Sequence, residues 1–267
     1  SYRMKSEGSA RVLDASGNDV TKQFIVHVTE KELKILPRTL TITSSAANKE
    51  YDGTALKAES ITIGADGFAV GEGAIYSYSG QQVLPGSSDN IFTYELQEGT
   101  LAENYSIRLI YGKLSVIDRN VPYEITVEAL SGKEKYDGSE HVLNGFKTLE
   151  FEVDGNKYTV SGLTAEGRGT DSGSYPVEIH GDAVIRDKSG NDVTSQFALH
   201  KVSGILQIEK RSVILSSASA DKVYDGKALT AADVSVSGDG FAANEGASYE
   251  VNGSRTLVGS SENSFSY

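Results

Sequence analysis

Apolar and polar residues alternate with a period of two in short runs along the chain. Clear examples are residues 105–109, 114–116, 123–127, 151–153 and 206–208. Such alternation is typical of a β-strand that turns one face to a core and the other to water. No segment keeps the 3.6-residue period of an amphipathic helix over three turns. The chain is therefore predicted to be all-β.

Turn-forming residues separate the alternating runs. Asp154-Gly155-Asn156 lies between residues 151–153 and 157–160. Glycine tolerates the positive φ of a tight hairpin turn, so a hairpin is predicted here. The glycine-rich residues 162–169 lack the Gly-Lys-Ser/Thr of a phosphate-binding loop and are expected to form a mobile connection.

The chain contains a long internal repeat. Residues 1–94 recur as residues 174–267 without insertion or deletion, so that Tyr51 returns as Tyr224 (224 − 51 = 173). A third Tyr-Asp-Gly begins at Tyr136 with different flanking residues, which indicates that two kinds of repeat alternate. Each single unit has 81 residues (119 − 38) or 92 residues (211 − 119). Units of this length are too long for a solenoid repeat and suit small independent domains.

The joints at Arg38, Arg119 and Arg211 divide the chain into four parts. We call residues 38–118 the first repeat and residues 119–210 the second repeat; these are the two complete units, of the first and second type respectively. Residues 1–37, the N-terminal segment, match the C-terminal part of a second-type repeat. Residues 211–267, the C-terminal segment, match the N-terminal part of a first-type repeat. We expect the natural protein to extend in both directions.

Each complete repeat is predicted to end in a short closing strand, at residues 112–116 in the first and residues 204–208 in the second. Leu33 and Ile35 hold the matching apolar positions of the N-terminal segment. Several short strands in 80 to 90 residues favour a β-sandwich. Asp171, Gly173 and Tyr175 resemble the tyrosine corner of immunoglobulin folds, in which the hydroxyl bonds back to nearby backbone. The fold expected is a set of tandem immunoglobulin-like β-sandwich domains in an elongated array.

The Tyr-Asp-Gly trio is the sharpest local motif. An exposed Tyr beside Asp is suited to contacting a sugar or a peptide, but recurrence in every repeat favours a structural device. We expect the tyrosine to cover the core and Asp-Gly to make the turn. The nine residues are Tyr51, Asp52, Gly53, Tyr136, Asp137, Gly138, Tyr224, Asp225 and Gly226.

A wider pattern joins these features. Lys-x-Tyr-Asp-Gly-(Thr or Lys)-Ala-Leu is followed by Gly-Phe-Ala, Glu-Gly-Ala, Gly-Ser-Ser-x-Asn, Asn-Tyr-Ser-Ile and Gly-Lys-Leu-Ser-Val. In the first repeat these are residues 49–56, 67–69, 72–74, 86–90, 104–107 and 112–116. The pattern resembles the Tyr-Asp-Gly repeats of the MBG family, which are strung in tandem along bacterial cell-surface and secreted proteins. The resemblance implies an immunoglobulin-like fold and an extracellular location, and it brings no catalytic residues.

Composition narrows the class further. The chain has no cysteine, so it has neither disulfides nor thiolate metal sites. A net charge of −12 argues against a nucleic-acid partner, whose phosphates would be repelled. No apolar run approaches the length of a membrane span, so this segment is not expected to enter a membrane. We expect a monomer.

Candidate chemistry is sparse. Residues 14–19 and 187–192 suggest a calcium loop, but the twelfth positions are Ile25 and Ala198 rather than Glu, which favours a hairpin turn held by Asp and Asn side chains. No metal or other cofactor is expected. A Lys49–Asn104 isopeptide crosslink is conceivable, although Gln196 stands at the position of Asn104 in the second repeat. The histidines His27, His141, His180 and His200 show no metal-ligand spacing.

The sequence therefore predicts a non-catalytic stalk or spacer in a large, adhesin-like bacterial cell-surface or secreted protein. The alternative is an adhesion module that binds host or cell-surface carbohydrate or protein, with Tyr76 and Tyr78 as aromatic surface. An enzyme is not expected, because no repeat contains a recognisable catalytic constellation.

Overall fold

The computed structural model describes residues 2, 3 and 5–267. These residues form β-strands and three short 3-10 turns, with no α-helix among them. The all-β prediction is confirmed. The chain separates into two compact units, residues 1–117 and 118–267, and each is described by itself. Their boundary lies one residue before the expected limit between the two complete repeats, and the other expected limits fall inside the units.

The elements of the first unit follow in chain order. They are β1 (Tyr2–Arg3), η1 (Thr21–Gln23), β2 (Glu32–Leu33), β3 (Arg38–Ser44), β4 (Ala47–Glu50), β5 (Ile61–Ala65), β6 (Ala74–Tyr78), β7 (Gly86–Asp89), β8 (Phe92–Leu96), η2 (Ala102–Asn104), β9 (Tyr105–Ile110) and β10 (Lys113–Ile117).

The elements of the second unit are β11 (Tyr123–Glu128), β12 (Gly132–Lys135), β13 (His141–Asn144), β14 (Glu150–Val153), β15 (Asn156–Gly169), β16 (Gly173–Asp187), η3 (Thr194–Gln196), β17 (Phe197–Val202), β18 (Gly204–Glu209), β19 (Val213–Ser217), β20 (Val234–Gly238), β21 (Glu250–Val251) and β22 (Phe265–Ser266).

The first repeat is built from small sheets with strand orders β5-β3-β9, β4-β10-β7 and β6-β8. The last two strands of the repeat pair in parallel with its first two strands, β9 with β3 and β10 with β4. The inward residues of β3, Leu40 and Ile42, are almost fully buried and pack with Phe92 and Tyr105. Alternate burial along β3 is the period-two pattern of the sequence realised in space.

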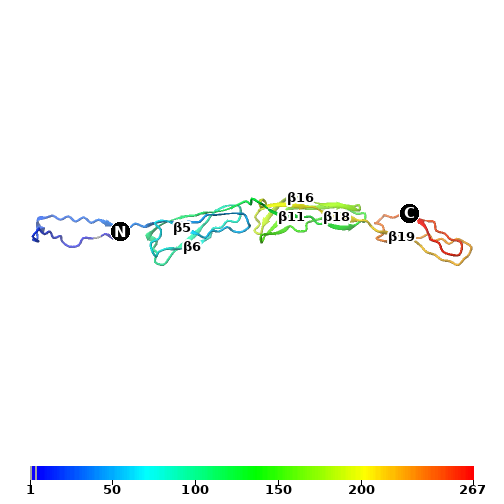
Figure 1. The fold of residues 1–267 in the computed structure, drawn as a ribbon, viewed down its shortest axis with the longest axis horizontal. Helices are drawn as coiled ribbons and strands as arrows, with labels where there is room; N and C mark the ends of the chain where they lie inside the picture. The colour runs from blue at the N-terminus through cyan, green and yellow to red at the C-terminus, as the bar shows by residue number, and fades with distance from the viewer. Residues whose placement is uncertain (1, 4) are drawn as a thin grey trace. The chain divides into compact units, whose positions relative to one another are not determined.

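The second repeat uses the same opening and closing pairs, β11 with β17 and β12 with β18, both parallel. Its larger sheet has the order β12-β18-β16-β15-β13, and β14 also pairs with β15. Figure 1 shows β16 running beside β18, as their antiparallel register requires. The predicted hairpin is confirmed: Val153 pairs with Asn156 across Asp154 and Gly155, which have φ of 50° and 75°.

The prediction of a mobile connection at residues 162–169 is wrong. These residues are the second half of β15 and pair with both β13 and β16. The glycines are there for close packing. A Cβ at Gly169 would lie 2.3 Å from the ring of Tyr175, and one at Gly167 would lie 2.7 Å from the Pro176 carbonyl oxygen. Gly162 has a φ of 80°, next to the register shift between Ser161 and Leu163.

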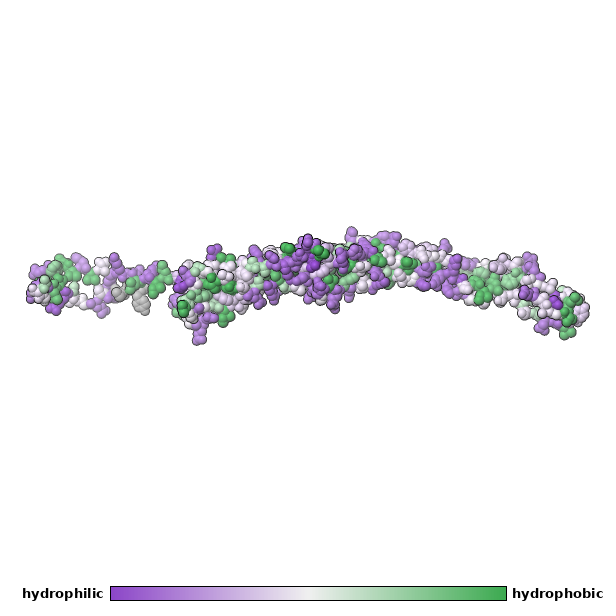
Figure 2. Space-filling model, viewed as in Figure 1, coloured by the Kyte–Doolittle hydropathy of each residue, from purple (hydrophilic) through white to green (hydrophobic). Residues whose placement is uncertain are grey.

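The C-terminal segment has only the strand pairs β19–β20 and β21–β22. The two pairs reproduce β3–β5 and β6–β8 of the first repeat. Large apolar side chains of this segment remain exposed, and Figure 2 shows hydrophobic residues at the surface around β19. The N-terminal segment likewise exposes Leu33 (63%) and Ile35 (96%). The most exposed apolar side chains of the C-terminal segment are Ile214, Val223, Tyr224, Leu257, Val258 and Tyr267.

Candidate functional site: the Tyr-Asp-Gly turns and a joint between repeats

The Asp-Gly part of the motif forms the same turn in all three copies. The carboxylate accepts a hydrogen bond from the backbone amide two residues later, at 2.8 Å for Asp52, 2.8 Å for Asp137 and 3.0 Å for Asp225. The following glycine has a φ between 75° and 83° in each case, a conformation that side chains with a Cβ rarely adopt. The motif therefore fixes a local turn.

A basic residue completes each turn. Lys49 contacts Asp52 at 2.6 Å, Lys222 contacts Asp225 at 2.9 Å, and His141 contacts Asp137 at 3.1 Å. The Lys222 side chain and the turn amides hold the pKa of Asp225 below its usual value. Lys49 Nζ also donates to the carbonyl and hydroxyl oxygens of Thr54. These partners all lie in the turn, so the structure gives no support for a crosslink to Asn104.

The tyrosine of the motif has a different environment in each copy. Tyr51 is fully buried in the first repeat. Tyr136 packs only partly against the core of the second repeat, and its hydroxyl donates to Glu245 in the C-terminal segment. Tyr224 is 60% exposed. The exposed fraction and the partners of the motif tyrosine therefore differ among the three copies in this chain.

The contact made by Tyr136 belongs to a joint between the second repeat and the C-terminal segment. Lys135, at the end of β12, forms a 2.6 Å ion pair with Asp239. Arg211, between β18 and β19, donates to the carbonyl oxygens of Tyr136 at 3.2 Å and Gly240 at 2.8 Å, and also to that of Asp239. The hydrogen bond to Glu245 is the largest cause of a raised pKa at Tyr136. Residues of the second repeat and of the C-terminal segment are therefore bonded to each other. The ion pair with Lys135 holds the pKa of Asp239 below its usual value.

The first repeat carries the same acceptor groups. Arg38 bonds the carbonyl oxygens of Asp66 and Gly67 as Arg211 bonds those of Asp239 and Gly240. The counterpart of Glu245 is Glu72, which accepts from the hydroxyl of Tyr105. Arg38 is exposed, whereas Arg211 is half-buried against the second repeat.

The start of the second repeat is fixed by a buried glutamine. Gln196 is fully buried; its Oε1 accepts from the backbone amide of Arg119 at 3.0 Å, and its Nε2 donates to Asp118 at 2.5 Å. The guanidinium of Arg119 stacks 3.8 Å from the ring centre of Tyr123. Burial and a hydrogen bond to Asp154 raise the pKa of Tyr123 to about 12. Asp118 and Arg119, which lead into the second repeat, are thus in contact with residues of that repeat.

The Asp171, Gly173 and Tyr175 motif forms a corner. The hydroxyl of Tyr175 donates to the carbonyl oxygen of Asp171 at 3.0 Å. The ring lies across Gly169, where a Cβ has no room, and beside Gly173. The corner joins the end of β15 to the start of β16 and is a structural device.

The residues suggested for a calcium loop form Asx turns. Asp14 accepts from the amides of Ser16 and Asn18, and Asp187 accepts in the same way from Ser189 and Asn191. Over the part of the chain that the structure describes, no three His, Asp or Glu side chains gather as metal ligands. His200 contacts Glu124 at 2.6 Å and His180 lies near Glu178, both at the surface.

The aromatic residues considered for binding are used in packing. Tyr76 and Tyr78 are half-buried and pack on the core cluster around Phe92. The rings of Tyr76 and Phe92 make an edge contact with centroids 6.2 Å apart. Burial raises the pKa of Tyr76. These two tyrosines therefore do not form an open aromatic platform.

Sequence reasoning located a joint at Arg211 but missed three other residues that form it, Lys135, Asp239 and Glu245. Only the recurrence of Asp66 and Glu72 at an offset of 173 offered a signal for them. Within the described residues, no helix is long and apolar enough to cross a membrane. Comparison with known proteins adds no identity, since no family model, no curated protein and no solved structure matches the chain.

Proposed function

We propose that this chain is a non-catalytic spacer segment of a bacterial cell-surface or secreted protein, and that its alternating repeats hold other parts of that protein at a distance. The observation that carries the proposal is the joint at Arg211. An ion pair and several hydrogen bonds connect consecutive repeats there, where a flexible linker would have none. The resemblance of the repeat pattern to the MBG family supports the extracellular location.

The distribution of titratable groups also supports a structural role. The lowered pKa values of Asp137 and Asp192 come first from hydrogen bonds donated within their own turns. Perturbed groups at an active site instead converge on a cleft. We therefore favour the spacer over an enzyme. Tyr76 and Tyr78 are partly buried against the core, which supports the spacer over the adhesion alternative that relied on them as aromatic surface.

The experiment measures the stiffness of the joint in the full chain. Because the protein has no cysteine, spin labels are introduced only at Ser189 and Ser254, both exposed. Double electron–electron resonance then gives the distribution of distances between the two spin labels, which lie on either side of the joint. We expect a narrow distribution, which broadens in the double variant Lys135→Met, Tyr136→Phe.

A matched control separates the joint from general loss of charge. Lys133 lies on the same strand as Lys135 and pairs at 3.0 Å with Glu209, inside the second repeat. The variant Lys133→Met should leave the distribution narrow. A broad distribution in the unsubstituted chain, or equal broadening by both changes, would contradict the proposed spacer.

A further inference from the structure

Each complete repeat begins and ends with strands that run in the same direction. In the first repeat, β9 pairs in parallel with β3, beginning where Tyr105 lies opposite Arg38. β10 pairs in parallel with β4, ending where Ile117 lies opposite Glu50. We call β3 and β4 the entry strands of the repeat, and β9 and β10 its exit strands.

This arrangement decides how a pull along the chain acts on the repeat. The chain enters at the first residue of β3 and leaves at the last residue of β10. Figure 1 shows the chain entering the first repeat at one end and leaving it at the other. A pull on both ends therefore slides the exit strands along the entry strands. The evenly spaced hydrogen bonds of the parallel ladders then stretch together, whereas a pull across the strands breaks them one after another.

Buried side chains oppose the same sliding motion. Leu40 and Ile42 of the entry strands are almost fully buried, and so are Leu114 and Val116 of the exit strands. Side chains alternate between the two faces of a strand, so a shift of one residue brings inward positions opposite outward ones. The strands therefore cannot slide past each other without losing both their hydrogen bonds and their packing.

The two ladders meet at a cluster of buried hydrogen bonds. The Ser44 hydroxyl accepts from the Gly112 amide at 3.0 Å and donates to the Asn90 carbonyl oxygen at 2.6 Å. The Asn90 amide donates to the Gly112 carbonyl oxygen at 2.7 Å. A Cβ at Gly112 would lie 2.4 Å from the Ser45 carbonyl oxygen, so the entry and exit strands touch directly here. We call Ser44, Asn90 and Gly112 the buried junction.

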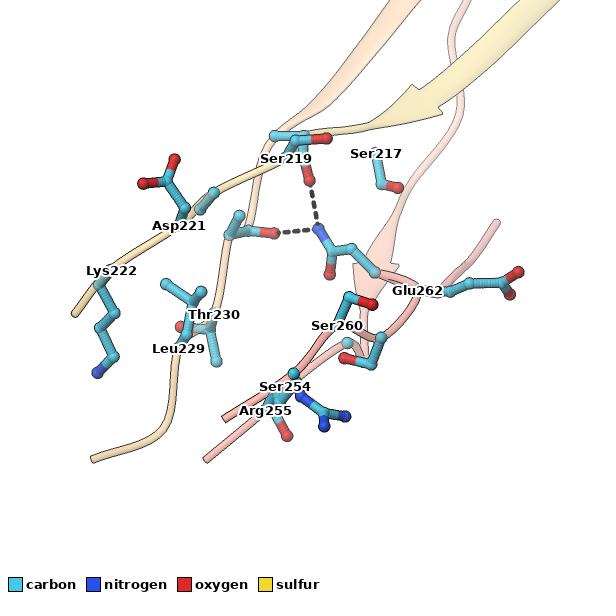
Figure 3. A pocket seen from close by; sticks show the side chains of 17 residues that line it. Ser217, Ser219, Asp221, Lys222, Leu229, Thr230, Ser254, Arg255, Ser260 and Glu262 are labelled. Carbon is cyan, nitrogen blue, oxygen red and sulfur yellow. Dashed lines mark hydrogen bonds between the residues drawn. The ribbon is translucent and has the colours of Figure 1, made fainter. Parts of the chain in front are cut away.

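The side chain of Asn90 ties the buried junction to the rest of the repeat. Its Nδ2 donates to the carbonyl oxygens of Ser45 and Ala58, at 2.9 and 2.7 Å. Asn263 makes the equivalent two bonds in the C-terminal segment, both at 2.9 Å, which are drawn as dashed lines in Figure 3. Because these bonds hold the link between β3 and β4 in place, the entry strands take a load as one piece.

The second repeat has the same arrangement with different strands in its middle. β11 pairs in parallel with β17, and β12 pairs in parallel with β18. Gly204 stands where Gly112 stands in the first repeat, and a Cβ there would lie 1.9 Å from the Leu130 carbonyl oxygen. Entry and exit strands in parallel contact are therefore common to both types of repeat.

We propose that each complete repeat is a tension-bearing unit, which resists a pull transmitted along the chain because that pull shears its entry strands against its exit strands. The proposal goes beyond the spacer role, since a spacer with stiff joints can still contain repeats that unfold easily under load. The two also fail separately. The spin-label distances test the joint at Arg211, whereas the resistance to tension resides inside each repeat.

The test pulls on the first repeat, within the full chain, in two directions. The protein has no cysteine, so cysteines introduced in pairs at exposed positions attach DNA handles for optical tweezers. The pair Lys34→Cys and Asn120→Cys applies the load from end to end and shears the ladders. The pair Lys34→Cys and Glu103→Cys applies it where the β3–β9 ladder begins, and peels β3 from β9.

The first repeat should unfold at a higher force when it is pulled from end to end. At equal force, we expect its unfolding rate to be about tenfold lower or less than in the peeling direction, because several ladder bonds must break together. Equal rates in the two directions, or faster unfolding from end to end, would overturn the proposal.

The variant Ser44→Ala tests the buried junction. It should accelerate end-to-end unfolding about tenfold at equal force. Peeling starts at Arg38 and reaches residue 44 last, so the peeling rate should not change. Ser88→Ala is the matched control, because its hydroxyl donates to Gln81 and joins no entry strand to an exit strand; it should change neither rate.

Equal acceleration of both directions by Ser44→Ala would make this serine a general stability contact and would count against the proposal, as would equal effects of Ser44→Ala and Ser88→Ala. If Ser44→Ala does not fold, the comparison of the two pulling directions in the chain that keeps Ser44 still decides the matter.

Discussion

Replacing the motif tyrosine with alanine should have very different effects in two copies of the same sequence. Tyr51 is fully buried, and a buried aromatic side chain removes about 150–250 Å² from water. At about 25 cal/mol per Å² this area is worth roughly 4–6 kcal/mol as an upper estimate. Measured aromatic-to-alanine changes in cores cost about 3–5 kcal/mol, so we expect Tyr51→Ala to lower the free energy of unfolding of the first repeat by that amount. Tyr224 is 60% exposed, and Tyr224→Ala should change the stability of its segment by about 0.5 kcal/mol or less.

Hydrogen exchange followed by mass spectrometry reads both regions in the full chain. In Tyr51→Ala, amides of β3 and β10 should exchange about a hundredfold to a few thousandfold faster, since each 1.4 kcal/mol is a factor of ten. Tyr51→Leu, which keeps much of the apolar contact, should lose less and covers the case in which the alanine variant does not fold. Equal acceleration by Tyr51→Ala and Tyr224→Ala would refute the assignment of different environments.

Two further predictions concern the joint and a closing strand. Lys135→Met should raise the pKa of Asp239 toward its usual value in a carboxylate NMR titration. Because the native pKa is depressed, the ion pair stabilises the joint fully above the usual value near 3.8, and this contribution is lost as pH falls through the lower native value. Gly204→Ala would place a Cβ 1.9 Å from the Leu130 carbonyl oxygen and should unfold the second repeat. At Gly190 an added Cβ would have no atom within 4 Å, but φ is 83°. Gly190→Ala should therefore lower the free energy of unfolding, measured by thermal unfolding, by only about 1–2 kcal/mol through backbone strain.

Local features were predictable from sequence where a local cause fixes them. The hairpin at Asp154 and Gly155 needs only two residues that accept positive φ, and the alternation in β3 shows directly which side chains face the core. Residues 162–169 were misjudged because glycine has two opposite uses. It loosens a loop, but it also permits close approach, and at Gly169 the reason is the ring of Tyr175 from another strand. That cause is not local in sequence.

The contacts of the joint could not be predicted from the sequence, because they too join residues that are distant along the chain. Lys135 and Asp239 are 104 residues apart, and neither belongs to a motif whose chemistry implies a partner. The repeat showed that Asp66 and Asp239 are equivalent, but not that Asp239 pairs with Lys135 of the second repeat. Equivalent residues share backbone geometry, while their tertiary partners depend on the neighbouring unit.

The glutamate of the joint has a different hydrogen-bond donor in each of its two copies. Glu72 accepts from Tyr105 of its own closing strand through Oε2, whereas Glu245 accepts from Tyr136 of the preceding repeat through Oε1. The Tyr136 hydroxyl reaches Glu245 because this tyrosine is only partly buried against the core of the second repeat, whereas Tyr51 of the first repeat is fully buried. The same repeat position thus serves a contact within one repeat at Glu72 and a contact between repeats at Glu245.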